Sequence, residues 1–326
     1  MNKKNRSILI TGGTGSFGKR FIKYLLELNY YSRIIVFSRD ELKQYEMQKM
    51  GYDQNCMRYF IGDIRDYDRL RRAFESVNVV IHAAALKQVP SCEYNPLEAI
   101  KTNILGSSNV INAALDMGVE KVIALSTDKA VNPVNLYGAT KLAAEKLFIQ
   151  SNTYAGKKPT RFSCVRYGNV VGSRGSVIPL FVNQKNSGYV TITDERMTRF
   201  WITLDQGVKF VYKCLEFMNG GEIFVPKIPS MRIVDLAKII APNDSFLITG
   251  IRSGEKLHET LISIDEAKNT VEMEDMYIIQ PSTELWFNKN LGEKGKPLLG
   301  DFSYTSDTNP RWLDKDEILN IISSLS

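Results

Sequence analysis

The stretch SILITGGTGSFG, residues 7–18, decides the fold of this chain. A short apolar run is followed at once by Gly12, Gly15 and Gly18, and then by an amphipathic stretch. Glycines at this spacing allow a tight turn, close approach of a pyrophosphate to the backbone, and close packing of a helix on a strand. The helix N-terminus then presents N–H groups to the phosphates. The pattern predicts a strand, a loop and a helix that bind a dinucleotide; a purely structural turn is the alternative. The residues expected to contact the dinucleotide here are Gly12, Thr14, Gly15, Ser16, Phe17 and Gly18.

The same strand–helix alternation continues through the first half of the chain. Further apolar runs lie at 33–39, 57–63, 77–85 and 121–127. They are rich in Val, Ile and Phe without polar alternation, which is typical of parallel strands buried on both faces. Helical patterns lie at 17–28, 41–50, 67–76, 96–117 and 136–150. The alternation predicts an α/β protein with a doubly wound parallel sheet, the Rossmann arrangement.

The pattern loosens beyond about residue 170. The runs SVIPLF, VTITD, GEIFVP and SFLITG are expected to form short strands, and helices are expected at 204–218, 233–240, 264–269 and 315–324. A length of 326 residues is typical of about two domains, at roughly 150 residues each. The predicted division is a dinucleotide-binding domain at 1–170, to which part of 196–230 returns, and a smaller C-terminal α/β substrate lobe at 171–326. A cleft between lobes is where ligands usually bind.

The composition argues against several classes of protein. The 42 Lys and Arg exceed the 36 Asp and Glu by only 6, and no basic stripe is interleaved with aromatic residues as a nucleic-acid face requires. No apolar run approaches the roughly 18 residues of a membrane span. The 4 cysteines form no CxxC pair, so neither a structural zinc site nor a disulfide framework is expected. We expect a soluble, cytoplasmic protein without a metal and without nucleic-acid or membrane partners.

The end of the second predicted strand bears on the choice between NAD and NADP. An acidic residue there would bond the ribose 2′-hydroxyl, whereas a cation accommodates a 2′-phosphate. Ser38 and Arg39 occupy this position and Lys43 lies one helical turn further on, which favours NADP. Asp40 and Glu41 also follow the strand, although a helix start favours acids for capping reasons alone.

Asp63 and Ile64 end the third predicted strand, where they are placed to contact the adenine end of the dinucleotide. The alternative for Asp63 is a simple helix cap.

Tyr137 and Lys141, four residues apart, lie on one face of a helix. An ammonium lowers the pKa of a nearby tyrosine, so the phenolate can take a hydroxyl proton while hydride leaves the same carbon. The preceding strand ends at Thr127, whose hydroxyl can hold the substrate oxygen; an ordinary exposed Tyr–Lys pair is the alternative.

With the glycine loop upstream, the set Thr127, Tyr137 and Lys141 resembles the extended, nucleotide-sugar branch of the short-chain dehydrogenases/reductases. The HAAA stretch at 82–85 fits that branch, and the resemblance implies that Ala83 and Ala85 approach the nicotinamide ribose. Sugar-nucleotide 4,6-dehydratases generally carry Thr-Asp-Glu where this chain has Thr127-Asp128-Lys129.

The lysine at position 129, in place of the usual glutamate, points to one group among these dehydratases. The accompanying motifs are HAAALKQVP (82–90), RYGNV (166–170), RGSVIP (174–179), MTRF (197–200) and RSGEK (252–256). Together they resemble the inverting UDP-N-acetylglucosamine 4,6-dehydratases, which start the pathway to pseudaminic acid, a sugar of flagellin and cell surfaces. A capsule-type 4,6-dehydratase/5-epimerase shares STDK and ALKQVP but lacks the tyrosine; Tyr137 and residues 220–238 favour the pseudaminic branch. A UDP-sugar 4-epimerase, which would not need Asp128 and Lys129, and a non-catalytic dinucleotide-binding protein remain alternatives.

The resemblance implies roles for individual residues. Asp128 would protonate the departing C6 hydroxyl, and Lys129 would take the C5 proton, for which the lysine must be neutral; burial and the Lys141 charge are expected to promote this. The implied substrate contacts are Lys87 near the reacting sugar, Asn169 and Val177 along the nucleotide, Arg199 and Arg252 on the diphosphate, and Glu255 at the uridine ribose. The resemblance also implies a homo-oligomer.

Overall fold

The computed structural model describes residues 6–172, 177–185, 188–281 and 295–323. The stretch around the glycine loop forms β1 (Ser7–Thr11) and α1 (Ser16–Leu28), as predicted. The next predicted strands are observed as β2 (Arg33–Ser38), β3 (Met57–Ile61), β4 (Val79–His82) and β5 (Lys121–Thr127). The helices between them include α2 (Glu41–Met47), α3 (Tyr67–Ala73) and α7 (Leu136–Gln150).

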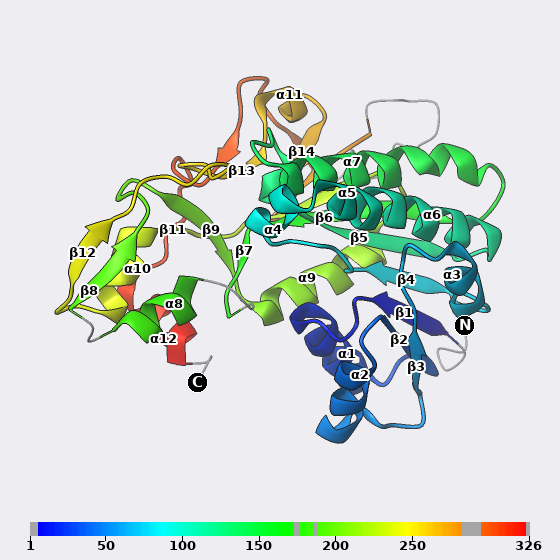
Figure 1. Ribbon diagram of the computed structural model, residues 1–326. Helices are drawn as coiled ribbons and strands as arrows, with labels where there is room; N and C mark the ends of the chain where they lie inside the picture. Colours follow the sequence, from blue (N-terminus) through cyan, green and yellow to red (C-terminus); the bar gives the residue numbers. More distant parts are fainter. Residues whose placement is uncertain (1–5, 173–176, 186–187, 282–294, 324–326) are drawn as a thin grey trace.

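Within the described ranges, the main sheet has the strand order β16-β14-β15-β10-β6-β5-β4-β1-β2-β3 (Figure 1). Seven neighbouring strands of this sheet run parallel to one another: β3, β2, β1, β4, β5, β6 (Arg161–Tyr167) and β10 (Ile223–Pro226). An antiparallel edge adds β15 (Met276–Ile279), β14 (Thr270–Glu272) and β16 (Lys296–Pro297). The order changes direction at β1 and β4, the point where such sheets open a ligand crevice. The predicted doubly wound fold is confirmed.

Helices cover both faces of this sheet, so its central strands are buried. On one face lie α5 (Pro96–Ile100), a π-helical turn (Lys101–Leu105), α6 (Gly106–Asp116) and α7 (Figure 1). A single helix was predicted at 96–117, whereas the structure has α5, the π-helical turn and α6 there. Helix α4 (Val89–Tyr94), which precedes them, was not predicted. On the other face α1 packs against α9 (Leu204–Phe217). The inward residues of β1 and β2 are less than 2% exposed, which explains their continuous apolar sequence.

The second lobe has a hydrophobic core of its own, which includes Phe181, Trp201 and Leu236. Its sheets pair β8 (Tyr189–Ile192) with β12 (Ser245–Ile248), and β9 (Thr198–Ile202) with β7 (Asn169–Val170) and β11 (Ser230–Arg232). Its helices are α8 (Val177–Gln184), α10 (Ile233–Ile240) and α12 (Lys315–Ser323). Near the junction of the lobes lie β13 (Thr260–Ile262), α11 (Ile264–Ala267) and β17 (Tyr304–Thr305).

The predicted strand SVIPLF is wrong for the residues that the structure describes: from Val177 onward it is helix α8, and Ser176 lies outside the described residues. A short apolar run does not distinguish a buried strand from a helix, and Pro179 is tolerated because it falls in the first helical turn. Strands β14 to β16 join the main sheet although they lie within 171–326. The division at residue 170 stays a prediction. Nowhere in the described ranges is there a helix both long enough and apolar enough to span a membrane.

Candidate active site

A cleft of about 820 Å³ opens along the carboxyl ends of the parallel strands. The carboxyl ends of parallel strands meet at one edge of a sheet, so loops distant in sequence gather there. The cleft is lined by every residue predicted to contact the dinucleotide. They are Gly12, Thr14, Gly15, Ser16, Phe17, Gly18, Ser38, Arg39, Lys43, Asp63, Ile64, Ala83, Ala85, Tyr137 and Lys141.

The glycine loop has the close contacts that require glycine. Gly12 has a φ of +66°, and a Cβ there would lie 3.0 Å from the backbone of Ala84. A Cβ on Gly18 would lie 2.5 Å from the backbone of Gly13, so this glycine lets α1 pack against the loop. Gly15 directly precedes α1 and has no side chain with which to cap it. The first-turn N–H groups are therefore available to a phosphate, and the loop fits a dinucleotide.

The acidic residue after β2 is engaged by the helix that it starts. Asp40 caps α2 by accepting a hydrogen bond from the Lys43 backbone N–H at 3.0 Å, and its carboxylate also contacts the Lys43 ammonium. Ser38 Oγ lies 2.8 Å from Thr14 Oγ1, which holds it beside the glycine loop. Arg39 is left 55% exposed at the cleft. This arrangement favours Ser38 and Arg39 as the groups that meet the adenosine ribose.

Asp63 is not a helix cap. The N-cap of α3 is Asp66, whose side chain accepts from the Arg69 backbone N–H at 2.9 Å. Asp63 pairs instead with Arg65, at 2.7 Å, and with Arg39, at 3.6 Å. The Asp63 carboxylate thus links the ends of β2 and β3 at the rim of the cleft.

The catalytic pair predicted on α7 lies in the cleft with Thr127. Asn135 fixes the start of α7 by accepting from the Gly138 N–H at 2.7 Å. Gly138 is needed because a Cβ there would lie 2.2 Å from the Lys129 carbonyl oxygen. This contact presses the first turn of α7, which carries Tyr137, against the 3₁₀ turn Asp128–Ala130 that follows β5.

The electrostatics of the pair differ from the expectation. Burial raises the pKa of Tyr137 to about 12, and the charge that opposes this rise is the Lys129 ammonium, together with a hydrogen bond to Thr127. Lys141 is buried and donates to the Leu125 carbonyl at 2.7 Å; burial lowers its pKa. Lys129 is thus the cation with the larger effect on the Tyr137 pKa, and the prediction that the Lys141 ammonium also lowers it stays a prediction.

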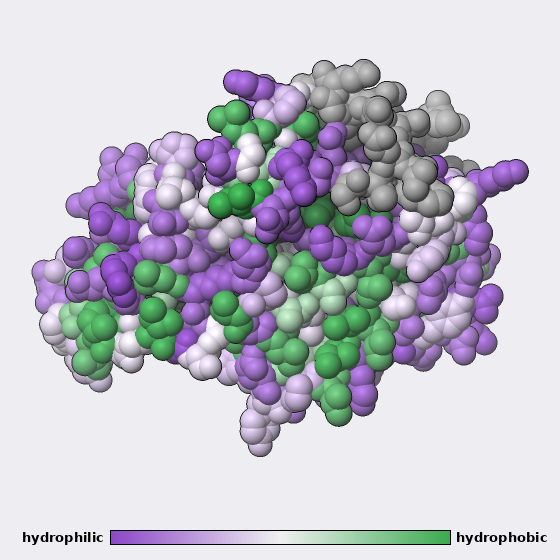
Figure 2. Space-filling model, turned by 90° about the horizontal axis from the view of Figure 1, so that it is seen from above, coloured by the Kyte–Doolittle hydropathy of each residue, from purple (hydrophilic) through white to green (hydrophobic). Residues whose placement is uncertain are grey.

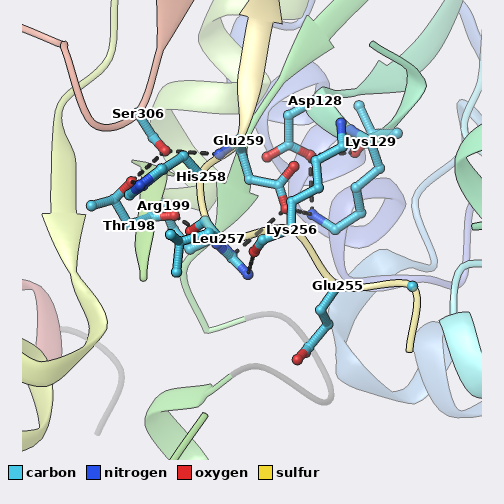
Figure 3. Close-up of polar contacts among 12 residues, drawn as sticks. Asp128, Lys129, Thr198, Arg199, Glu255, Lys256, Leu257, His258, Glu259 and Ser306 are labelled. Carbon is cyan, nitrogen blue, oxygen red and sulfur yellow. Dashed lines mark hydrogen bonds and ion pairs between the residues drawn. The ribbon is translucent and has the colours of Figure 1, made fainter. Parts of the chain in front are cut away.

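Lys129 lies between two carboxylates (Figure 3). Its Nζ is 3.1 Å from Asp128 Oδ1 and 3.5 Å from Glu259 Oε1. Burial alone lowers the pKa of this lysine, but Asp128 and then Glu259 outweigh burial and raise it above the ordinary lysine value. The expectation of a neutral Lys129 is wrong for this structure, because sequence reasoning counted the neighbouring cation and missed the second carboxylate.

Two of the predicted substrate residues, Lys87 and Asn169, line the cleft. Asn169 Oδ1 and Ser126 Oγ are buried there without a hydrogen-bond partner in the described part of the chain. Buried polar atoms are rarely left unpaired, so both are suited to contact a ligand. Val177, Arg199, Arg252, Glu255 and the carboxylic acid Asp128 are not among the lining residues.

The surroundings of these remaining residues differ from one another. Arg199 is 7% exposed, and its guanidinium donates to the carbonyls of Thr198, Lys256 and Leu257. Arg252 is exposed, in a turn closed by Glu255. That turn is tied to the start of α7, because Asn135 Nδ2 donates to the Gly254 carbonyl at 2.7 Å. Val177 begins α8. The assignment of these residues to the diphosphate, the nucleotide and the ribose stays a prediction.

Sequence reasoning missed two kinds of residue. Gln88, Thr102, Tyr167 and Leu204 also line the cleft; Tyr167 ends β6, and its place at a carboxyl strand end was the signal that could have identified it. Glu259 has no such local signal, because only the fold brings it to Lys129. Among the described residues, no group of His, Cys, Asp and Glu is arranged to hold a metal ion.

Comparison with known proteins gives the family. The model of a family described as polysaccharide biosynthesis protein matches residues 8–281. The chain is 59% identical to a protein of Campylobacter jejuni subsp. jejuni serotype O:23/36 named UDP-N-acetylglucosamine 4,6-dehydratase (inverting), over 98% of this chain and 97% of the relative. It is 42% identical to a protein of Rickettsia rickettsii named UDP-glucose 4-epimerase, over 98% of this chain and 96% of the relative.

Solved structures agree with the fold. The X-ray structure of Pen from Bacillus thuringiensis has a TM-score of 0.90 and 38% identity, covering 100% of this chain and 99% of that one. The dTDP-glucose 4,6-dehydratase DesIV from Streptomyces venezuelae, with NAD and TYD bound, has a TM-score of 0.69 and 23% identity, covering 77% of this chain and 86% of that one. The chain therefore belongs to the polysaccharide biosynthesis protein family, within the extended short-chain dehydrogenases/reductases, as a homologue of the inverting UDP-N-acetylglucosamine 4,6-dehydratases.

Proposed function

We propose that this chain is an inverting UDP-N-acetylglucosamine 4,6-dehydratase, a hydro-lyase that forms UDP-2-acetamido-2,6-dideoxy-β-L-arabino-hex-4-ulose. The observation that carries this assignment is the cluster at one end of the dinucleotide cleft. There Tyr137 and Lys129 line the cavity, and Asp128 lies 3.1 Å behind the lysine. A nicotinamide dinucleotide bound in this cleft would take hydride from C4 of the sugar and return it to C6.

Oxidation of C4 needs a base for the C4 hydroxyl proton. Tyr137 is the group proposed for this step, with Thr127 holding the sugar oxygen beside it. Because burial holds the pKa of Tyr137 at about 12, the phenolate needs nearby positive charge when it forms. Lys129 and Lys141 are the cations that the fold supplies around it.

Elimination of water needs a base at C5 and an acid at C6. Once C4 is a ketone the C5 proton is acidic enough for an amine. The proton that Lys129 must lose is also the proton that Asp128 must gain, and the two atoms are 3.1 Å apart. One transfer from Nζ to the carboxylate thus prepares both groups. Protonation of C5 from the opposite face then inverts that carbon.

A UDP-sugar 4-epimerase is the alternative, since it shares the Tyr–Lys pair and one relative is named as such. It would have no use for the buried Asp128–Lys129 pair. Incubation with UDP-N-acetylglucosamine in D₂O, followed by NMR, separates the two. A 6-deoxy-4-keto sugar with deuterium at C5 supports the dehydratase, UDP-N-acetylgalactosamine supports the epimerase, and unchanged substrate contradicts both.

NADP is the proposed form of the dinucleotide, because Arg39 faces the cleft while Asp40 is engaged in capping α2. Arg39→Asp should weaken NADP binding by about 10- to 100-fold, since a charged hydrogen bond contributes about 1.5–3 kcal/mol, and should weaken NAD binding much less. Calorimetric titration with each dinucleotide measures this. Arg72→Asp, the same charge change at an exposed site on α3, is the control. A native extract containing only NAD would refute the assignment.

Arg252 is proposed as a diphosphate anchor, because its turn is tied to the start of α7. Arg252→Ala should raise KM, and weaken UDP binding, by about 10- to 100-fold with little change in kcat, since the contact is present in both ground and transition states. Steady-state kinetics and UDP titration measure both quantities. Arg232→Ala, at an exposed arginine paired with Asp235 on α10, should change neither. A collapse of kcat with intact UDP affinity would contradict the anchor.

The wider assignment follows the resemblance. We propose a cytoplasmic enzyme, without nucleic-acid or membrane partners, that acts at the first step of pseudaminic acid synthesis for flagellin or surface glycans.

A homo-oligomer is also proposed. The face above α4 to α7 carries groups of hydrophobic residues among hydrophilic ones (Figure 2). Tyr94 and Leu97 are 86% and 66% exposed on α4 and α5, and such side chains are suited to contact a second copy.

A further inference from the structure

Glu259 is a buried carboxylate that the reaction described above does not use. Its side chain is 3% exposed, and Oε1 lies 3.5 Å from Lys129 Nζ and 3.7 Å from Arg199 Nε. Oε2 is buried without a hydrogen-bond partner in the described part of the chain. Glu259 is absent from the lining of the cleft, whereas Lys129 is part of it. The carboxylate therefore reaches the cleft only through the lysine.

The backbone of Glu259 is fixed from the substrate lobe. Its N–H donates to Ser306 Oγ at 2.9 Å, and the Ser306 N–H donates back to its carbonyl at 2.8 Å. Ser306 Oγ in turn lies 2.6 Å from Thr198 Oγ1 (Figure 3). Arg199 holds the residues just before Glu259 through the Lys256 and Leu257 carbonyls. This fixation from several directions places the carboxylate at a defined point beside Lys129.

Glu259 keeps a cationic partner in both states that the lysine must adopt. With Lys129 protonated, Lys129 and Arg199 face the carboxylates of Asp128 and Glu259, and the Lys256 ammonium also acts on both carboxylates. When the lysine gives its proton to Asp128, Glu259 still has Arg199 as its partner. A buried carboxylate with no partner would be strongly disfavoured, so Arg199 lets Lys129 discharge without leaving Glu259 alone.

We propose that Glu259 is a positioning residue for Lys129: it holds the amine between Asp128 and the cleft and stabilises the ammonium that forms when the C5 proton is taken. This inference rests on the proposed function, in which Lys129 is the C5 base. In that step the C5–H bond breaks, the proton goes to Nζ, and the electron pair passes into the C4 carbonyl as an enolate. Arg199, through its contacts with Glu259 and residues 256–257, supports this geometry.

The test isolates the C5 step from hydride transfer. A 4-keto-6-deoxy sugar with uninverted C5, whose C5 proton lies on the same face as in UDP-N-acetylglucosamine, is incubated with the protein in D₂O, and loss of the C5 proton signal is followed by NMR against a sample without protein. Glu259→Gln keeps the size of the side chain but removes the charge, and it should slow exchange by about 10- to 100-fold, the effect of losing one charged contact. Glu259→Asp keeps the negative charge on a side chain that is one methylene shorter, and should recover part of the rate of C5 proton exchange. Glu272→Gln, at a surface carboxylate paired with Lys227 at 2.7 Å, should exchange as the unmodified protein does.

Two further measurements separate positioning from a structural role. In Glu259→Gln the affinity for UDP and the 340 nm signal of C4 oxidation in a single turnover should both be retained. If Glu259→Gln loses C5 exchange, UDP affinity and the 340 nm signal together, Glu259 supports the whole site and the inference is overturned. Exchange at the normal rate in Glu259→Gln, with exchange abolished in Lys129→Ala, would overturn the inference and leave the base assignment intact. Normal exchange in Lys129→Ala would overturn both.

Discussion

Lys129→Ala should still oxidise C4 of UDP-N-acetylglucosamine but fail to eliminate water. In the proposed mechanism oxidation depends on Tyr137 and Lys141, whereas removal of the C5 proton depends on the amine that this change deletes. The loss of a general base typically slows a step by about 10²–10⁴-fold. In a single turnover the absorbance at 340 nm should therefore rise and persist, and in D₂O the C5 position of the bound 4-keto sugar should stay largely unlabelled.

The folded structure gives this variant a specific side effect. Removing the Lys129 ammonium leaves Asp128 and Glu259 as two buried carboxylates with one fewer cation between them. Glu259 should then take up a proton more readily, because burial already raises its pKa. The oxidation step should also slow modestly, since Lys129 is the cation that lowers the pKa of Tyr137. Lys146→Ala, at an exposed position on α7, is the matched control. Turnover by Lys129→Ala within a few-fold of the unmodified protein would exclude the lysine as the C5 base.

Tyr137→Phe should stop the reaction one step earlier. The change removes only the phenolic oxygen, and the ring retains its packing against Cys92 and Ala99. With no group in place to take the C4 hydroxyl proton, the 340 nm signal itself should fall by about 10²–10⁴-fold. Stopped-flow absorbance under single-turnover conditions measures this loss.

The two variants can be told apart on one substrate. Tyr137→Phe should still exchange the C5 proton of a 4-keto-6-deoxy sugar with uninverted C5, because that step needs Lys129 and not the phenol. Tyr154→Phe, at a tyrosine 73% exposed, provides the control for the loss of a hydroxyl. A Tyr137→Phe protein that forms the reduced dinucleotide at the normal rate would show that another group is the C4 base.

Local sequence was sufficient for the parallel sheet and the dinucleotide loop. Strand runs such as 7–11 and 33–38 have apolar centres because both faces of the sheet are covered, and Gly15 and Gly18 are required by contacts with Gly12 and Gly13, a few residues away. Once the strands are known to be parallel, their carboxyl ends must share an edge. For this reason the predicted dinucleotide residues all line one cleft.

Several features of the second lobe depended on tertiary contacts. The apolar run that begins at Val177 became helix α8, because burial against α10 and β8 decided between two conformations that a short run permits equally. Arg199, which as a sequence motif suggested a diphosphate contact, is buried with its guanidinium on three carbonyls. A side chain's burial and partners are properties of the packed fold, and neither is written in a five-residue motif.

The charge state of Lys129 most clearly separates what the local sequence predicts from what tertiary contacts decide. The sequence by itself determined that an aspartate and a lysine follow β5 beside a tyrosine on the next helix, because these positions are close along the chain. The charge of that lysine is favoured by Asp128 and, in addition, by Glu259, which directly precedes β13 and which the fold brings to 3.5 Å from Nζ. Electrostatic interactions act through space and strengthen where water is excluded. The proposed reacting groups could therefore be identified in the sequence, whereas the charges around them depend on Glu259, which only the tertiary structure brings close.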